Sequence, residues 1–279
     1  MNSPLVTIAI PIYNAERYLH DAIQSCINQT YTNWELLLMC DGSTDNSTNI
    51  AYEMAAKDSR SRVINDGVNK GLFYRLNQSV KLAKGELYAR MDADDIMYIT
   101  RIEEQVKYFE DLPDADVVGR SIMTIDNENN IVGSGLYEGR VTGFVHPTIM
   151  GKTLWLKENP YAEWPLRAED TELWCRTSTK SNFYAIGKPL FFYREFGVPT
   201  FAKYYLSEKT LIKVYLRYAE YGKSLFWCIK NIFAALVKIA LYAIFSTFNK
   251  TDFLVRLRKR EIIPIEKLLT SDDLAKSIM

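Results

Sequence analysis

The stretch Tyr88-Ala89-Arg90-Met91-Asp92-Ala93-Asp94-Asp95 decides how the rest of the sequence is interpreted. Residues 85–89 form an apolar lead-in that predicts a short buried strand, and this strand runs directly into three carboxylates. If the chain stays extended, Asp92 and Asp94 project to one side and Asp95 to the other. Two hard oxygen ligands side by side at a strand end suit Mg²⁺ or Mn²⁺, with positions left for water and phosphates.

The same carboxylates have a second interpretation that involves no metal. They can form a solvated acidic loop, with Asp95 near the positive N-terminus of a helix over residues 96–110. The eight residues alone favour neither interpretation, so the decision rests on the motifs that accompany them.

Three apolar runs precede this stretch, and polar residues follow each of them. The expected strands are 5–10 (closed by Pro11), 34–40 and 63–65, and the stretches with helical spacing are 18–29, 47–57 and 72–83. All-apolar strands that alternate with helices are typical of a parallel sheet covered by helices on both faces. Ligands bind beyond the carboxyl ends of such strands, where Tyr13, Asp41, the 66–71 loop and Asp92/Asp94 all fall.

Local signals define the turns and the remaining elements. Asn14 is a candidate N-cap for the helix 18–29, and Ser43 or Asp45 for the helix 47–57. Beyond the acidic stretch we expect a helix over 99–109, strands over 117–123 and 131–134 around a turn at 127–130, a helix over 171–179, and strands over 183–186 and 190–193. The predicted fold is α/β, with a catalytic domain over 1–200 and a helical, amphipathic region over 201–279.

Charge is unevenly distributed along the 279 residues, although the net charge is zero. Residues 1–200 carry 20 basic and 27 acidic side chains, whereas residues 201–260 carry 12 basic and 3 acidic ones. An acidic body with a basic, apolar tail predicts contact with a membrane surface or a partner, and not with nucleic acid. The four cysteines have no CxxC spacing, and no charged segment precedes the first apolar run, so we expect a cytoplasmic location without zinc or disulfides.

Several enzyme classes lack their motifs here. No GxGxxG follows the first strand and no GxxxxGK[ST] occurs, which argues against dinucleotide oxidoreductases and P-loop phosphotransferases. A nucleotidyltransferase usually has a glycine-rich loop with a basic residue after the first strand, and Pro11-Ile12-Tyr13-Asn14 is neither. It remains one alternative, and a degenerate sugar-nucleotide-binding module is another.

Four motifs in order resemble the inverting family 2 glycosyltransferases, which have the GT-A fold. They are Pro11-Ile12-Tyr13-Asn14, Asp41-Gly42-Ser43-Thr44-Asp45, Arg90–Asp95, and Glu169-Asp170 before Leu173-Trp174. The resemblance covers about residues 5–195. It implies a GT-A-like sheet, a Mn²⁺ or Mg²⁺ cofactor, a nucleotide-sugar donor with UDP expected, and a glycan or lipid-linked acceptor in cell-surface polysaccharide synthesis.

The predicted nucleotide-sugar site comprises Pro11, Tyr13, Asn14, Asp41, Arg75, Arg90, Asp92 and Ala93. The resemblance implies that Tyr13 packs on the base, Asp41 accepts a hydrogen bond from the pyrimidine, and Asp92 lies near the ribose. It further implies that Asp94, with Asp92, holds the metal. Asp170 is the implied catalytic base, with Glu169 as the alternative, since one carboxylate must take the proton of the acceptor hydroxyl.

Each of these roles has a plain structural alternative. Tyr13 can be a core aromatic, Asp41 the first residue of a turn, and Asp170 a cap for the following helix. Arg75 and Arg90 can meet the phosphates or neutralise the acidic cluster, and His146 is expected to be structural or on the acceptor side. Where many relatives have a histidine soon after Tyr-Arg, this chain continues with Glu195-Phe196, which leaves Arg194 to face the diphosphate.

The basic region contains one long apolar stretch, residues 224–248, interrupted by Lys230, Asn231 and Lys238. These polar residues and Ser246 are expected on one broad side of a helix, with a wide apolar face elsewhere. Arg256, Arg258, Lys259 and Arg260 follow, so residues 224–260 predict peripheral contact with an anionic membrane surface. The alternatives are a homodimer or partner interface, a membrane span, or packing against the catalytic domain.

Overall fold

The computed structural model describes two compact units. The described residues are 3–135, 137–165, 167–195, 200–218, 224–248, 250, 251, 253 and 269–279. Unit 1 takes those within 1–160, 181–195 and 261–279, and unit 2 takes those within 161–180 and 196–260. This division differs from the predicted boundary near residue 200, because residues 169–177 belong to unit 2 and the last helix belongs to unit 1. Arg256, Arg258, Lys259 and Arg260 lie outside the described residues.

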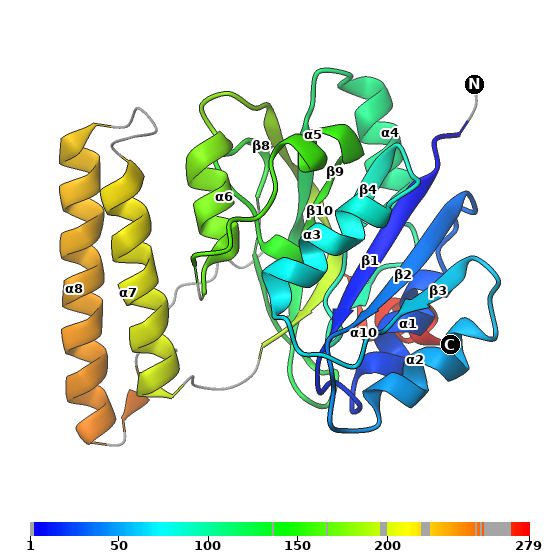
Figure 1. Cartoon of the computed structure of the whole chain (residues 1–279), viewed down its shortest axis with the longest axis horizontal. Helices are drawn as coiled ribbons and strands as arrows, with labels where there is room; N and C mark the ends of the chain where they lie inside the picture. The colour runs from blue at the N-terminus through cyan, green and yellow to red at the C-terminus, as the bar shows by residue number, and fades with distance from the viewer. Residues whose placement is uncertain are drawn as a thin grey trace. The chain divides into compact units, whose positions relative to one another are not determined.

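Unit 1 is built around one mixed sheet (Figure 1). Its strands are β1 (Val6–Ile12), β2 (Trp34–Cys40), β3 (Ser61–Ile64), β4 (Leu87–Arg90), β5 (Ile96–Met97), β6 (Val117–Ile125), β7 (Ile131–Gly135), β8 (Gly139–Arg140), β9 (Met150–Lys152) and β10 (Phe183–Arg194). The order along the sheet is β3-β2-β1-β4-β9-β6-β10-β5, with β7 paired to β6 and β8 to β10. The first four strands in this order are mutually parallel, as predicted.

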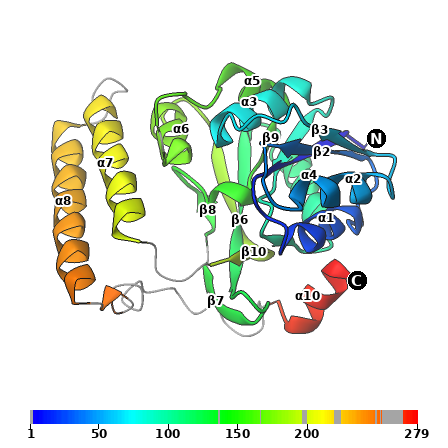
Figure 2. The same ribbon diagram turned by 60° about the horizontal axis from the view of Figure 1, so that its bottom comes forward.

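Helices cover both faces of this sheet (Figure 2). They are α1 (Leu19–Ile27), α2 (Ser47–Ala55), α3 (Leu72–Leu82), α4 (Arg101–Asp111), the 3-10 turn η1 (His146–Thr148), α5 (Thr153–Glu158) and α10 (Ser271–Ile278). The alternating residues Val6, Ile8 and Ile10 of β1 pack with Leu19 and Ile23 of α1 in the main hydrophobic core. Helix α3 packs against β1, β2 and α5. The α/β prediction with helices on both faces is confirmed.

Two boundaries differ from the sequence prediction in ways that matter for the site. Strand β1 continues through Pro11 to Ile12, although a proline cannot donate to a ladder. The ladder with β4 ends at the pair Ala9–Arg90, so the nitrogen of Pro11 lies beyond the last β4 partner. The helix expected to start at residue 96 or 99 starts at Arg101 instead, because Ile96–Met97 pairs with β10 as β5.

The predicted strands 183–186 and 190–193 are a single strand, β10, with irregular register between Ile186 and Phe192. Asn14 caps no helix, since Tyr18 occupies the N-cap position of α1. Unit 2 contains α6 (Glu169–Thr177), α7 (Phe201–Tyr218) and α8 (Leu225–Thr247). The C-terminal helical region predicted from the sequence is therefore present.

The loop that delivers the chain to β4 depends on Gly85. A Cβ atom at this position would lie 2.5 Å from the nitrogen of Thr7 and 2.7 Å from the carbonyl oxygens of Leu5 and Leu87. Gly85→Ala should therefore lower the free energy of unfolding by about 1–3 kcal/mol, because backbone atoms have to move. Urea unfolding measures this loss. The neighbouring exposed change Lys84→Ala should leave stability nearly unchanged, and equal effects of the two substitutions would contradict the close-approach argument.

Candidate active site

The predicted donor-site residues of unit 1 gather at the carboxyl ends of β1, β2 and β4. Tyr13 and Asn14 follow β1, Asp41 follows β2, and Asp92 and Asp94 follow β4. Because β1 pairs with both β2 and β4 in parallel, these three ends meet at one edge of the sheet. The predicted convergence of the three motifs is therefore present in the fold.

The acidic cluster contains three carboxylates, one more than the sequence analysis assigned to a metal. One side-chain oxygen from each of Asp92, Asp94 and Asp95 lies within 4.8 Å of the others. The expectation that Asp95 points away is wrong, because the chain turns at residues 93–94 instead of staying extended. The amide of Asp95 donates to the carbonyl of Asp92 across this turn, at 3.5 Å.

Asp95 is buried, which rules out the solvated, helix-capping loop. Its side chain belongs to a residue that is only 1% exposed, and its Oδ1 accepts a hydrogen bond from the amide of Arg194 at 2.7 Å. Its Oδ2 is buried without a hydrogen-bond partner among the described residues. A buried carboxylate oxygen without a partner is costly unless something positive binds it.

Electrostatics in the cluster favour a cation. Burial, and after it the charge of Asp92, raises the pKa of Asp94 to about 6. Burial, and then Asp94, raises the pKa of Asp95 well above its ordinary value. Opposite ligands of an octahedral Mg²⁺ lie about 4.2 Å apart, twice the usual metal–oxygen distance. The three oxygens lie within 4.8 Å of one another, close to this span, and a divalent cation among them would offset their mutual repulsion.

The two arginines predicted for the phosphates have different roles. Arg90 is buried, and its Nη2 lies 2.8 Å from Asp92 Oδ1, so it neutralises part of the acidic cluster. Arg75 is fully buried and donates to Asp41, Asp66, Gln78 and the carbonyl of Val68. These bonds use all five of its N–H groups, so the structure leaves it no donor for a phosphate.

Asp41 organises the loop that leads into α3. Its Oδ1 accepts from the amide of Lys70 and from Arg75 Nε, and its Oδ2 accepts from the amide of Gly71. A carboxylate offers about four acceptor positions, so one remains on Oδ2. The carboxylate is thus more than a turn residue, because it ties β2 to residues 70, 71 and 75.

The β1 exit loop is tied to the turn after β2. Asn14 adopts a left-handed φ of 49°, and its Oδ1 accepts from the amide of Thr44 at 2.9 Å. The amide of Asn14 in turn donates to Ser43 Oγ. Tyr13, 53% exposed, presents its ring outside the core, so the core interpretation of this aromatic is wrong. Pro11 is half-buried and Ala93 is buried.

Two further arginines hold the acidic turn in place. Arg194 Nε donates to the carbonyl of Asp94 at 2.8 Å, and its other nitrogens donate to Asp126 and Asn129 in the β6–β7 turn. Its guanidinium also lies 4.1 Å from the centre of the Tyr18 ring. The sequence suggested that Arg194 faces the diphosphate. In the structure, Arg194 binds protein groups.

Arg101 is the second arginine that holds the acidic turn in place, and none of the sequence motifs described above includes it. It is fully buried in the first turn of α4, and its Nη2 donates to the carbonyls of Arg90, Pro147 and Ile149 at 2.9–3.2 Å. Its Nε donates to Gln105, and burial lowers its pKa to about 9. An arginine and a glutamine four residues apart on the apolar side of a predicted helix were the available signal.

His146 lies in η1, close to this arginine network. Burial, and after it the charge of Arg90, lowers the pKa of His146 well below its usual value. The imidazole is therefore neutral near pH 7, which agrees with the structural role expected for it. Neutral imidazole also adds no further positive charge next to Arg90.

The predicted base lies in unit 2, in the first turn of α6. The preceding residue, Ala168, has a left-handed φ of 59°, and the helix begins at Glu169. Asp170 Oδ1 accepts from the amide of Thr171 at 2.7 Å. This bond satisfies one of the amides that a helix start leaves without an internal partner, although the N-cap residue is Ala168, and a catalytic role of Asp170 stays a prediction.

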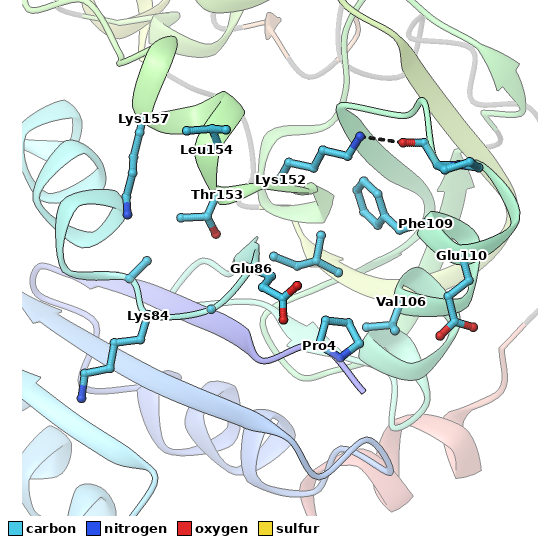
Figure 3. Close-up of a pocket in the computed structure, with 14 residues that line it drawn as sticks. Pro4, Lys84, Glu86, Val106, Phe109, Glu110, Lys152, Thr153, Leu154 and Lys157 are labelled. Carbon is cyan, nitrogen blue, oxygen red and sulfur yellow. Dashed lines mark hydrogen bonds between the residues drawn. The ribbon is translucent and has the colours of Figure 1, made fainter. Parts of the chain in front are cut away.

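A cavity of about 630 Å³ lies elsewhere in unit 1 (Figure 3). Its walls include Pro4 before β1, Glu86 before β4, Val106 of α4 and Lys157 of α5. These residues mark the amino ends of the parallel strands, whereas ligands of such sheets bind at the carboxyl ends. The cavity is therefore separate from the acidic cluster and from the predicted donor site.

An acidic turn at the carboxyl end of a parallel sheet, within this strand order, defines a glycosyltransferase of the GT-A type. The family model of glycosyl transferase family 2 matches residues 7–167. The chain belongs to glycosyl transferase family 2, as the four motifs indicated.

Relatives and solved structures agree with this assignment. The chain is 36% identical over 189 residues to a Bacillus subtilis protein named "Putative glycosyltransferase EpsE", and the match covers 63% of this chain and 68% of EpsE. It is 31% identical over 224 residues to an uncharacterized glycosyltransferase of Haemophilus influenzae, covering 73% of this chain and 69% of that protein.

Two solved structures share the fold at low sequence identity. S. aureus TarS 1–349 in complex with UDP-GlcNAc superposes with a TM-score of 0.67 at 18% identity, over 91% of this chain and 76% of that one. The mannosyltransferase PcManGT from Pyrobaculum calidifontis, in complex with GDP-Man and Mn²⁺, gives 0.62 at 15% identity, over 99% and 86%. At these identities the likeness establishes the GT-A fold.

The network around Arg101 makes a stability prediction. Arg101→Met should lower the free energy of unfolding by about 1–3 kcal/mol, because buried carbonyls lose their hydrogen-bond donor. Denaturant unfolding followed by circular dichroism measures the loss. As a control, Arg17→Met removes an exposed ion pair with Glu128 and should cost less than about 1 kcal/mol. Equal losses would show that Arg101 does not hold the end of β4.

Proposed function

We propose that this protein is a metal-dependent inverting glycosyltransferase that transfers a sugar from a UDP-sugar to a hydroxyl of a glycan or lipid-linked acceptor. The acidic turn after β4 carries the proposal, since three carboxylates converge there although burial and repulsion oppose it. The complexes of TarS with UDP-GlcNAc and of PcManGT with GDP-Man and Mn²⁺ support a nucleotide-sugar donor and a divalent ion.

The metal, Mn²⁺ or Mg²⁺, would be held by Asp94 and Asp92, with Asp95 as a third acidic neighbour. When bound, such an ion stabilises the negative charge that a departing nucleoside diphosphate gains. Two arginines position the proposed metal ligands. Arg90 orients Asp92 through its 2.8 Å contact, and Arg194 holds the backbone of Asp94.

Donor recognition is assigned to the loops after β1 and β2. Tyr13 offers an exposed aromatic ring on which a pyrimidine can stack. The free acceptor position on Asp41 Oδ2 can take one hydrogen bond from the base. Arg75 contributes indirectly, because it holds Asp41 and Asp66 in place.

Asp170 is the proposed base for the acceptor hydroxyl. A hydroxyl is a poor nucleophile until its proton is removed, and a positioned carboxylate commonly contributes a factor of about 10²–10⁴ in rate. Attack on the ring face opposite the departing diphosphate inverts the anomeric centre. Family membership and the intact Glu169-Asp170 pair favour this chemistry over the alternatives of nucleotidyl transfer and of a degenerate binding module.

The setting that we propose is the cytoplasmic face of the plasma membrane, in cell-surface polysaccharide synthesis. Residues 201–260 carry 12 basic and 3 acidic side chains. Among the described residues, α8 is the helix whose length and composition would allow it to cross a membrane. Peripheral contact through residues 224–260 would bring the enzyme to a lipid-linked acceptor, and a homodimer formed through the same surface is the competing arrangement.

Asp94→Asn tests the metal site in two ways. Transfer and the Mn²⁺-dependence of UDP binding should both be lost, because an amide cannot supply the anionic ligand. Without divalent ions at pH 7.5, the variant should instead be more stable than the wild type. The folded-state pKa of about 6 exceeds the ordinary value of 3.8, so the charged form destabilises the fold above pH 6.

The expected gain is on the order of 3 kcal/mol, from about two pKa units. It should vanish below about pH 4, where Asp94 is protonated in both states. Thermal unfolding in EDTA across this pH range, with the exposed Asp111→Asn as control, measures it. Metal-dependent UDP binding that survives in Asp94→Asn would rule out Asp94 as the ligand.

Asp170→Asn tests the base. UDP-sugar binding should stay near that of the wild type, whereas transfer should fall by at least ~10²-fold. Single-turnover assays with saturating donor separate the two quantities. Glu169→Gln is the matched control and should retain most of the transfer rate. The opposite result, with Glu169→Gln inactive and Asp170→Asn active, would reassign the base.

A further inference from the structure

Helix α8 has two different faces. Cys228, Ala235 and Tyr242 are buried on the side that packs against α7. The ring of Tyr242 stacks on Tyr204 at 4.0 Å, and Lys238 reaches Glu208 at 3.8 Å. Trp227 stacks on Tyr218 near the other end, so the two helices form an antiparallel pair (Figure 1).

The opposite face of α8 is apolar and exposed. Its large side chains are between 40% and 77% exposed, and they are Phe226, Ile229, Phe233, Leu236, Val237, Leu241, Ile244 and Phe248. At about 100° per residue these positions occupy an arc of about 140°. The sequence predicted one polar side for Lys230, Asn231, Lys238 and Ser246. The side that packs against α7 includes Asn231, Lys238 and Ser246, as predicted. Lys230 instead falls within the apolar arc. Monomeric soluble proteins rarely expose so continuous an apolar surface.

We infer that this face of α8 lies in the plane of an anionic lipid surface, with both helix ends on the same side of the membrane. The inference rests on the membrane setting proposed above and specifies the lipid class and the topology. Its competitors are a span across the bilayer and an interface with a second copy of the chain.

The path of the chain argues against a span. A single crossing would place Leu225 and Thr247 on opposite sides of the bilayer. Both ends, however, connect to unit 1, through β10 before unit 2 and through α10 after it. Helix α10 belongs to unit 1: Asn28 Nδ2 donates to the carbonyl of Ser277 at 3.1 Å, and Leu274 packs in a cluster with Ile96 and Phe192.

A return crossing is costly. Residues 249–268 include nine charged side chains among 20, and each charge near the bilayer centre costs roughly 2.5–3.5 kcal/mol. Helix α7 cannot accompany α8 into the hydrocarbon either, because it carries Lys203, Glu208, Lys209, Lys213 and Arg217. Insertion of α8 alone would break its aromatic contacts with α7. An in-plane position keeps those contacts and buries only the exposed face.

Charge selects the lipid. The net excess of basic residues over 201–260 favours an anionic surface, where each Lys or Arg contributes about 1 kcal/mol. A second copy of the chain would bring the same excess of positive charge against itself. An anionic lipid surface is therefore the better complement for this region.

Vesicle binding tests the lipid surface. The full chain should sediment with vesicles of phosphatidylglycerol and phosphatidylcholine, and much less with pure phosphatidylcholine. Phe233→Ser/Ile244→Ser should weaken binding at least tenfold, whereas Val132→Ser/Leu154→Ser, which changes exposed apolar residues of unit 1, should not. UDP binding confirms that each variant is folded. A dimer that stays in the supernatant with every vesicle would overturn both this inference and the proposed membrane setting, and would leave the catalytic proposal intact.

Cysteine labelling tests the topology. All four native cysteines are buried, so Ser224→Cys and Lys250→Cys, two exposed positions that flank α8 outside its apolar face, report on the two ends of the helix. In intact spheroplasts that express the full chain, a membrane-impermeant maleimide should label neither end, and after permeabilisation it should label both. Labelling of one end in intact spheroplasts would demonstrate a span and overturn the in-plane position, while the membrane setting would stand.

Discussion

Mutual repulsion among three carboxylates is the constraint on which the arrangement of unit 1 depends. Asp92, Asp94 and Asp95 lie within one turn, with ligand oxygens no more than 4.8 Å apart. Left alone, such a turn would open toward water. The surrounding fold prevents this through Arg90 on Asp92, the amide of Arg194 on Asp95, and Arg101 on the carbonyl of Arg90. Holding the three carboxylates together therefore costs the fold part of its stability.

Burial explains why arginines are the residues that hold the acidic turn in place. A guanidinium offers five donors in one plane, so a single buried side chain can serve several backbone carbonyls that the end of a sheet leaves without partners. Arg101 joins β4, η1 and the segment before β9 in this way. Arg194 joins the acidic turn to the turn between β6 and β7. Elements far apart in sequence therefore meet at the site through these two side chains.

The parallel half of the sheet was predictable because its signals are local. Strands β1, β2 and β4 are largely apolar runs, and polar residues follow each of them at the edge where the parallel topology collects the strand ends. The position of Asp95 was not predictable in this way, because it depends on the pairing of Ile96 with Phe192, 96 residues away. The contacts of Arg75 and Arg194 were not predictable for the same reason. Their partners Asp41, Asp126 and Asn129 come from other parts of the chain, and sequence spacing does not reveal them.

The use of arginines within the protein also bears on how a diphosphate would be stabilised. Arg75 has no donor left, Arg194 is engaged with three protein acceptors, and Lys70 Nζ lies 2.7 Å from Asp66. Arg75 could meet a phosphate only by leaving a buried carboxylate or carbonyl without its partner, and Arg194 and Lys70 are already bound to protein oxygens. A divalent ion at the acidic turn has no such conflict, since its ligands repel one another in its absence. The electrostatics of unit 1 therefore favour a metal ion over side-chain cations as the main positive charge at the leaving group.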